Sequence, residues 1–138
     1  MNELMLNFPS HLLWERPAGL ASPGFHLQHL SGVLDRVFTY ARNEALSPQQ
    51  FDELKAEGKN SETGSSTEEL VTGFNLQVDK AMEQLTKTDE NTLTDYRGIG
   101  RAALPSTVIG LLFHAAEHTM RHVGQLMVTA AAIREKQQ

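Results

Sequence analysis

Apolar residues recur every three or four positions over most of the chain, which is the spacing of amphipathic helices. The first long run contains Leu30, Val33, Leu34, Val37, Phe38 and Ala41. Ser22-Pro23 precedes it, and this pair is typical of a helix start because Ser caps the first turn and Pro fits its first position. The pattern therefore predicts a helix from Pro23 to about Leu46.

Two sequence patterns typical of capping boxes predict further helices. Ser47, with Gln50 three residues later, begins a short helix. Ser66 with Glu69 begins a longer one, whose apolar stripe extends to about residue 85. Between them, residues 58–66 are rich in Gly, Ser and Asn and form a linker.

The last third of the chain is a polar stretch followed by one long apolar pattern. Residues 86–104 are expected to form a long loop, and Pro105 to open a last helix that has no stop signal before about Arg134. No segment has the alternation of a convincing strand. We predict an all-α fold, an antiparallel four-helix bundle of a single domain over residues 1–138 with long loops.

Composition fits this prediction and excludes several classes of function. The 138 residues are 40% hydrophobic and carry a net charge of −5 without a basic cluster, so nucleic-acid binding is not expected. Cysteine is absent, which excludes disulfides, thiolate-bound zinc and iron–sulfur clusters. No apolar run reaches the ~18 residues of a membrane span, and the N-terminus lacks the pattern of a secretory signal. These features predict a cytoplasmic protein without a membrane partner.

The histidines carry most of the functional interpretation. His114, His118 and His122 are spaced four apart and share one helix face. Imidazoles at i and i+4 can converge on one divalent ion. His29 shares an apolar edge of its helix with Val33, so it points inward and can supply a third ligand from another helix.

Three neutral nitrogen ligands would leave a coordination position open, which is more typical of catalytic than of structural metal sites. We therefore expect metal ligands at His29, His118 and His122. The residues expected to support the ligands or line a pocket are His26, His114, Gln125, Glu117, Arg36 and Tyr40. The alternative is that the histidines are core residues that hydrogen-bond to the backbone or to each other.

Other metal motifs fit less well. His114 to His118 matches the H-x-x-E-H pattern of inverted zinc peptidases, but only Glu135 follows as an acidic ligand. Di-metal carboxylate bundles need Glu three residues before a histidine, and no histidine here has one. Haem ligation by a single histidine has no specific support.

Two segments, residues 22–36 and 114–126, resemble the DinB/YfiT-like superfamily. The second resembles the family's H-x-x-x-H-x-G-Q ending, here His118 to Gln125. The resemblance implies a four-helix bundle that binds a divalent metal through His29, His118 and His122. It also implies chemistry on thiols, since characterised relatives include thiol-dependent isomerases and S-transferases that act with low-molecular-weight thiols.

We accordingly expect a zinc- or nickel-dependent enzyme that activates a thiol or water for a small-molecule substrate, similar to S-transferases or hydrolases. The alternative is a non-catalytic, metal-stabilised bundle that acts as a stress-related or partner-binding dimer. Two departures from the family pattern stand out. Arg121 occupies a position where many relatives carry a histidine, and the chain ahead of His29 is short. A shortened N-terminal helix exposes one bundle face, which predicts a homodimer.

Overall fold

The computed structural model of the chain describes residues 1–61 and 64–136. The α-helices are α1 (Pro23–Ala41), α2 (Pro48–Ala56), α3 (Thr67–Lys87) and α4 (Val108–Glu135). The strands are β1 (Tyr96–Ile99) and β2 (Leu104–Thr107), and short 3₁₀ turns span Ser10–Leu12, Pro17–Gly19 and Glu90–Thr92. The fold is mostly helical, as expected, with one small sheet.

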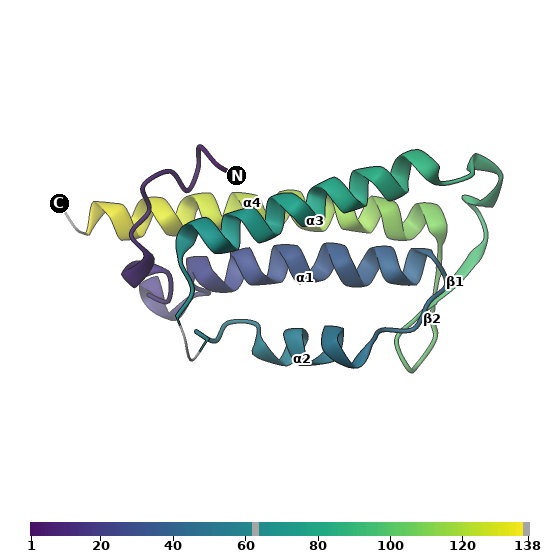
Figure 1. The fold of residues 1–138 in the computed structure, drawn as a ribbon, viewed down its shortest axis with the longest axis horizontal. Helices are drawn as coiled ribbons and strands as arrows, with labels where there is room; N and C mark the ends of the chain where they lie inside the picture. Colours follow the sequence, from purple (N-terminus) through teal and green to yellow (C-terminus); the bar gives the residue numbers. More distant parts are fainter. Residues whose placement is uncertain (62–63, 137–138) are drawn as a thin grey trace.

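Three long helices form the body of the molecule (Figure 1). Helix α1 packs against both α4 and α3, and α2 lies beside α1. Helices α1 and α3 run in one direction and α2 and α4 in the other. The expected four-helix bundle is not confirmed, because the fourth helix, α2, has only nine residues and buries none of them.

The core lies between the apolar faces of α1, α3 and α4. Its fully buried large side chains include Leu27, Leu30, Leu111, Leu126 and Ile133. Burying one such side chain contributes about 1.5–3 kcal/mol, so the contact between α1 and α4 is a major source of stability. This contact also fixes the spacing between the two helices that carry the histidines.

The N-terminal segment closes one end of the helices. Met5, Phe8, Leu12 and Leu13 are buried there. The Phe8 carbonyl accepts a hydrogen bond of 2.9 Å from Thr67 Oγ1 at the start of α3. Near the end of α4, Arg134 donates hydrogen bonds of 3.2 and 3.1 Å to the carbonyls of Leu4 and Leu6. The segment before α1 is therefore part of the core and not a free tail.

The predicted starts of α1, α2 and α3 are confirmed. Ser22 caps α1 by accepting a hydrogen bond from the Phe25 amide, and the capping boxes of α2 and α3 are both formed. The predicted end of α1 at Leu46 is wrong, since the helix ends at Ala41. Asn43 adopts a left-handed conformation with φ of 64°, which Asn tolerates and which stops the helix.

The expectation of a strandless loop over residues 86–104 is also wrong. Strands β1 and β2 pair antiparallel, with Tyr96 opposite Thr107 and Gly98 opposite Pro105. A two-stranded sheet has only edge strands, where proline is tolerated, so Pro105 lies in β2 and does not open the helix. Instead, Thr107 caps α4 by accepting a hydrogen bond of 3.1 Å from the Gly110 amide.

Among the helices that the structure describes, none combines the length and apolar character needed to cross a membrane.

Candidate metal centre

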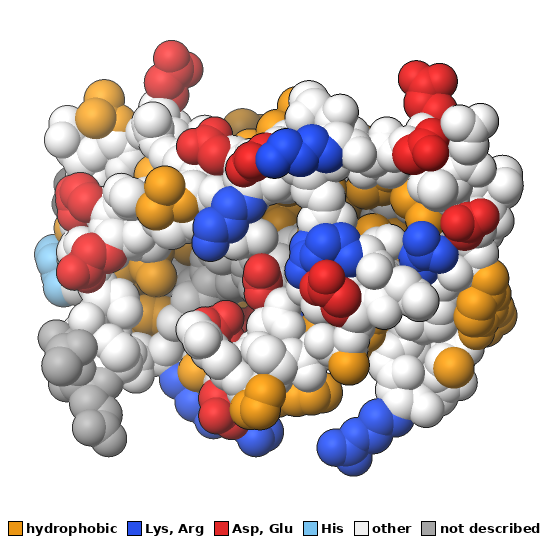
Figure 2. All heavy atoms as spheres, turned by 45° about the vertical axis from the view of Figure 1, so that its right-hand side comes forward, with side chains coloured by type: hydrophobic (Ala, Val, Ile, Leu, Met, Phe, Trp, Pro, Cys, Tyr) orange, Lys and Arg blue, Asp and Glu red, His pale blue; other side chains and the backbone are white. Residues whose placement is uncertain are grey.

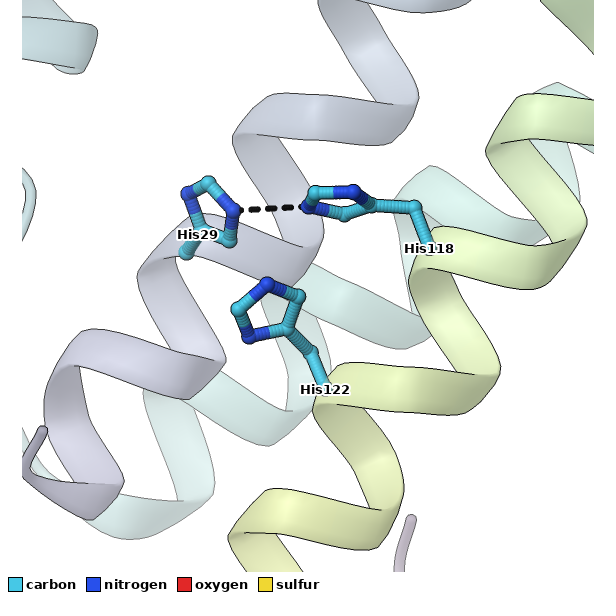
Figure 3. Close-up of side chains that lie close together, drawn as sticks. All are labelled: His29, His118 and His122. Carbon is cyan, nitrogen blue, oxygen red and sulfur yellow. Dashed lines mark hydrogen bonds between the residues drawn. The ribbon is translucent and has the colours of Figure 1, made fainter.

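His29, His118 and His122 meet where α1 packs against α4 (Figure 3). His29 lies in the second turn of α1, and His118 and His122 lie on consecutive turns of α4. One ring nitrogen from each lies within 4.8 Å of the others. The Nε2 atoms of His29 and His118 are 2.9 Å apart and directed at one another.

These distances fit a divalent ion after small side-chain adjustments. Zinc–nitrogen bonds of about 2.0–2.1 Å in tetrahedral geometry place ligand nitrogens roughly 3.3 Å apart. Imidazole nitrogen is a suitable donor for Zn²⁺ and Ni²⁺. Within residues 1–61 and 64–136, no fourth histidine, aspartate or glutamate joins this group. The cluster can thus hold an ion and leave a coordination position for another ligand.

Glu57 orients the His29 ring. Its Oε2 atom accepts a hydrogen bond of 2.7 Å from His29 Nδ1, and its Oε1 atom forms a 2.7 Å ion pair with Arg36. Burial raises the pKa of Glu57, but the hydrogen bonds from His29 and Arg36 outweigh burial and hold it below its usual value. An ionised carboxylate at Nδ1 keeps the His29 proton there and leaves the Nε2 lone pair for a metal, as in many carboxylate–histidine–metal sites.

His26 supports the His122 ring in a similar way. The two Nδ1 atoms are 3.1 Å apart, and His26 is only 3% exposed. Desolvation by burial, and then the neighbouring His122 and His29, lower the pKa of His26 to about 4. His26 is therefore a neutral imidazole at pH 7, able to accept a proton from His122 Nδ1 in a hydrogen bond.

The two cluster histidines on α4, His118 and His122, are also neutral at pH 7. Desolvation, followed by His122 and Arg121, lowers the pKa of His118 to about 4. Desolvation and His29 likewise lower the pKa of His122. Metal ligation requires deprotonated imidazole, so neutral rings are in the form that an ion needs.

A cavity of about 690 Å³ opens beside the cluster. Its lining includes Phe25, His26, Arg121, His122 and Gln125. The Phe25 ring stacks on the His29 ring with centroids 5.1 Å apart, which limits the movement of that ring. Gln125, expected near a ligand, thus lies on the wall of a cavity next to the candidate centre.

The remaining predicted residues lie further out. His114 and Glu117 form a 3.0 Å pair on a half-exposed part of α4, and with His118 they make a second potential ligand group. Arg36 is buried and engaged with Glu57, so it does not face a substrate. Tyr40 lines a separate cavity with Phe51, three helical turns beyond His29.

Sequence patterns missed Glu57 and Phe25. Phe25 had a usable signal, since it lies four residues before His29 on one helix and so shares its face. Glu57 had no such sequence signal, because it follows a short exposed helix and only the tertiary fold brings it close to His29.

The model of the DinB superfamily matches residues 3–126. The chain belongs to the DinB superfamily. No curated protein matches the chain.

Proposed function

We propose that the chain binds one divalent metal ion, Zn²⁺ or Ni²⁺, through His29, His118 and His122. The observation that carries this proposal is the convergence of three ring nitrogens within 4.8 Å from two separate helices. The lowered pKa values of His118 and His122 and the carboxylate behind His29 support it. The carboxylate of Glu57 holds the His29 proton on Nδ1, which leaves the Nε2 lone pair free for an ion.

We also propose that the site is catalytic and acts on a small molecule. A bound ion would supply Lewis-acid chemistry, lowering the pKa of a thiol or water. The chain's own residues supply the setting: Phe25 and His26 shield one side of the cluster from water, and Gln125 offers an amide at the cavity wall. Thiols of low molecular weight, as used by relatives, are the co-substrates that this setting would accept.

The second candidate function is a non-catalytic, metal-stabilised bundle that binds a partner, with a second copy of the chain as the first choice. It rests on an exposed apolar stripe along α4, where Phe113, Met120 and Met127 are spaced seven residues apart and are 71%, 77% and 55% exposed. A seven-residue repeat on one helix face is the pattern of helix pairing. We propose a homodimer through this stripe, which is compatible with either function.

Nucleic acid is not among the proposed partners. The chain has 12 basic and 17 acidic residues. On the face drawn in Figure 2, Lys and Arg side chains are interspersed with Asp and Glu side chains. A phosphate backbone needs a continuous basic surface, and this face has none.

Elemental analysis of untagged protein tests the metal site. We expect about one equivalent of ion per chain in the parent and near-complete loss in His118→Ala, since a two-ligand remnant binds weakly. His11→Ala is the matched control, because His11 is exposed and outside the cluster. A parent that is metal-free and takes up no added Zn²⁺ or Ni²⁺ would overturn the proposal.

Cobalt substitution separates the two functions. An open site should bind a small thiol, which adds an intense thiolate-to-cobalt absorption band. A structural site with all positions filled should show no spectral response to the thiol, and the catalytic proposal would then be wrong.

A further inference from the structure

Among the residues that the structure describes, Arg121 is the neighbour of the cluster whose hydrogen bond conflicts with metal binding. Its Nη2 atom lies 2.5 Å from His118 Nδ1. A guanidinium group only donates hydrogen bonds, so His118 Nδ1 must be the acceptor and carry no proton. The proton of the neutral His118 ring is then on Nε2, directed at His29 Nε2.

The result is one continuous chain of hydrogen bonds. Arg121 donates to His118, His118 donates to His29, and His29 donates to Glu57. In this series of hydrogen bonds every donor has an acceptor, so it needs no ion. It cannot persist when His118 uses Nε2 as a ligand, because the ring proton must then be on Nδ1, where it would face the guanidinium as a second donor. Ligation by His118 therefore releases Arg121.

The surroundings of Arg121 indicate what it binds once released. It lines the cavity beside the cluster, whose lining contains no aspartate or glutamate. No carboxylate lies within ion-pair distance of Arg121 among the described residues. Arg36, by contrast, is buried against Glu57. Arg121 is thus an uncompensated cation at a cavity in a chain whose net charge is −5.

The other walls of this cavity are largely apolar. They include Leu20, Phe25 and Val128. An apolar cavity with one guanidinium suits an organic anion, because arginine binds carboxylate and phosphate groups with two parallel hydrogen bonds.

Resting on the ion site proposed above, we propose that Arg121 binds the acidic group of an organic anion in this cavity, and that ligation of the ion by His118 frees it to do so. The substrate class is a small acid with an apolar body. Arg121 is then a specificity-determining residue for the site, and it is one that the family pattern does not supply.

Two probes of matched size test this on the Co²⁺-loaded protein. 3-Mercaptopropionate and 3-mercapto-1-propanol differ only in the acidic group, and each can be titrated calorimetrically and through the thiolate-to-cobalt band. We expect the parent to bind the acid about tenfold more tightly, the effect of one charge-assisted hydrogen bond. Arg121→Gln should lose this preference, and Arg121→Lys should keep part of it.

A second readout uses the ion alone. Removing the competing donor should leave the Zn²⁺ affinity of Arg121→Gln equal to that of the parent or several-fold higher, measured against a chelator. Arg101→Gln, at the hairpin turn, removes the same charge away from the cluster and should change neither result.

The outcomes separate the two proposals. A parent that binds neither Co²⁺ nor Zn²⁺ contradicts the ion site and this inference with it. A parent that binds the ion but shows no preference for the acid, or an Arg121→Gln variant that keeps the preference, contradicts only the role of Arg121. A loss of Zn²⁺ affinity in Arg121→Gln likewise contradicts the competition between Arg121 and the ion.

Discussion

His26 and His122 face each other through their Nδ1 atoms, 3.1 Å apart, from two different helices. Only one of the two atoms can carry the proton of this hydrogen bond. If His122 coordinates an ion through Nε2, its proton is on Nδ1 and His26 is the acceptor. His26 then supports the ligand in the way that Glu57 supports His29.

Replacing His26 tests this support. His26→Leu fills the buried position but leaves the His122 Nδ1 proton without an acceptor, so we expect Zn²⁺ affinity to fall about tenfold or more. His26→Asn offers an amide oxygen near the same point and should retain most of the affinity. Chelator competition at pH 7 measures both variants. Equal affinities in the two would show that the hydrogen bond plays no part.

Gly32 provides a separate test of Glu57. A Cβ atom at this position would lie 2.5 Å from Arg36 Nη1 and 2.6 Å from Glu57 Oε1. Gly32→Ala should therefore displace the ion pair and lower Zn²⁺ affinity about 10- to 100-fold through the loss of His29 orientation. Thermal stability should not fall in parallel, since alanine favours the helix over glycine by about 1 kcal/mol.

The control for this variant is Gly73→Ala on α3, where a Cβ atom meets nothing within 4 Å. It should gain helix stability and leave the Zn²⁺ affinity unchanged. If Gly32→Ala binds Zn²⁺ as tightly as Gly73→Ala does, Glu57 does not orient a ligand.

Acid should destabilise the ion-free protein through His26 and His118. The pKa values of His26 and His118 are about 4, below the ordinary value of 6.5. Between these pH values the unfolded chain binds protons that the folded chain does not, so stability falls as the pH decreases from 6.5 towards 4. We expect the Tm of chelator-treated protein to drop by several °C over this window.

Measuring the pH dependence of Tm in His26→Leu isolates the contribution of the His26 imidazole. This variant has no imidazole to protonate at position 26, so its Tm should depend less steeply on pH. A slope identical to that of the parent would mean that His26 titrates normally in the folded protein.

The stripe on α4 gives a prediction about assembly. Phe113→Glu places a charge where two apolar stripes would meet, and we expect it to convert a dimer to a monomer in sedimentation equilibrium. Met82→Glu, at an exposed apolar position of α3 (53% exposed, against 71% for Phe113), is the control and should leave the mass unchanged. A monomeric parent at micromolar concentration would contradict the proposed dimer.

Local sequence rules predicted the starts of α1, α2 and α3 because a cap involves residues only three positions apart. The N-caps Ser22, Ser47 and Ser66 are examples in which one hydroxyl and one nearby amide decide where the helix starts. The hairpin of β1 and β2 escaped the same rules, since its short strands contain no buried residue and Tyr96 pairs with Thr107 across a turn. The end of α1 depends on a single left-handed residue, Asn43, that apolar spacing does not reveal.

In the candidate site, too, local spacing predicted some residues and missed those that only the tertiary fold brings together. Helical spacing brought His118 and His122 together, and the inward edge of α1 placed His29 opposite them. Spacing could not identify Glu57, which is 28 residues from His29 in the chain and lies 2.7 Å from it in space. Nor could it separate Arg36, which is tied to Glu57, from an arginine available to a substrate.

Glu57 directly follows α2, the helix that buries none of its residues. A helix held so lightly is expected to open locally, at a free-energy cost far below that of global unfolding. Each opening would withdraw the carboxylate from His29 while the three long helices stay intact. Amide hydrogen exchange in residues 48–57 should therefore slow when Zn²⁺ is added, and any partner that pulls α2 away would weaken ion binding without touching a ligand.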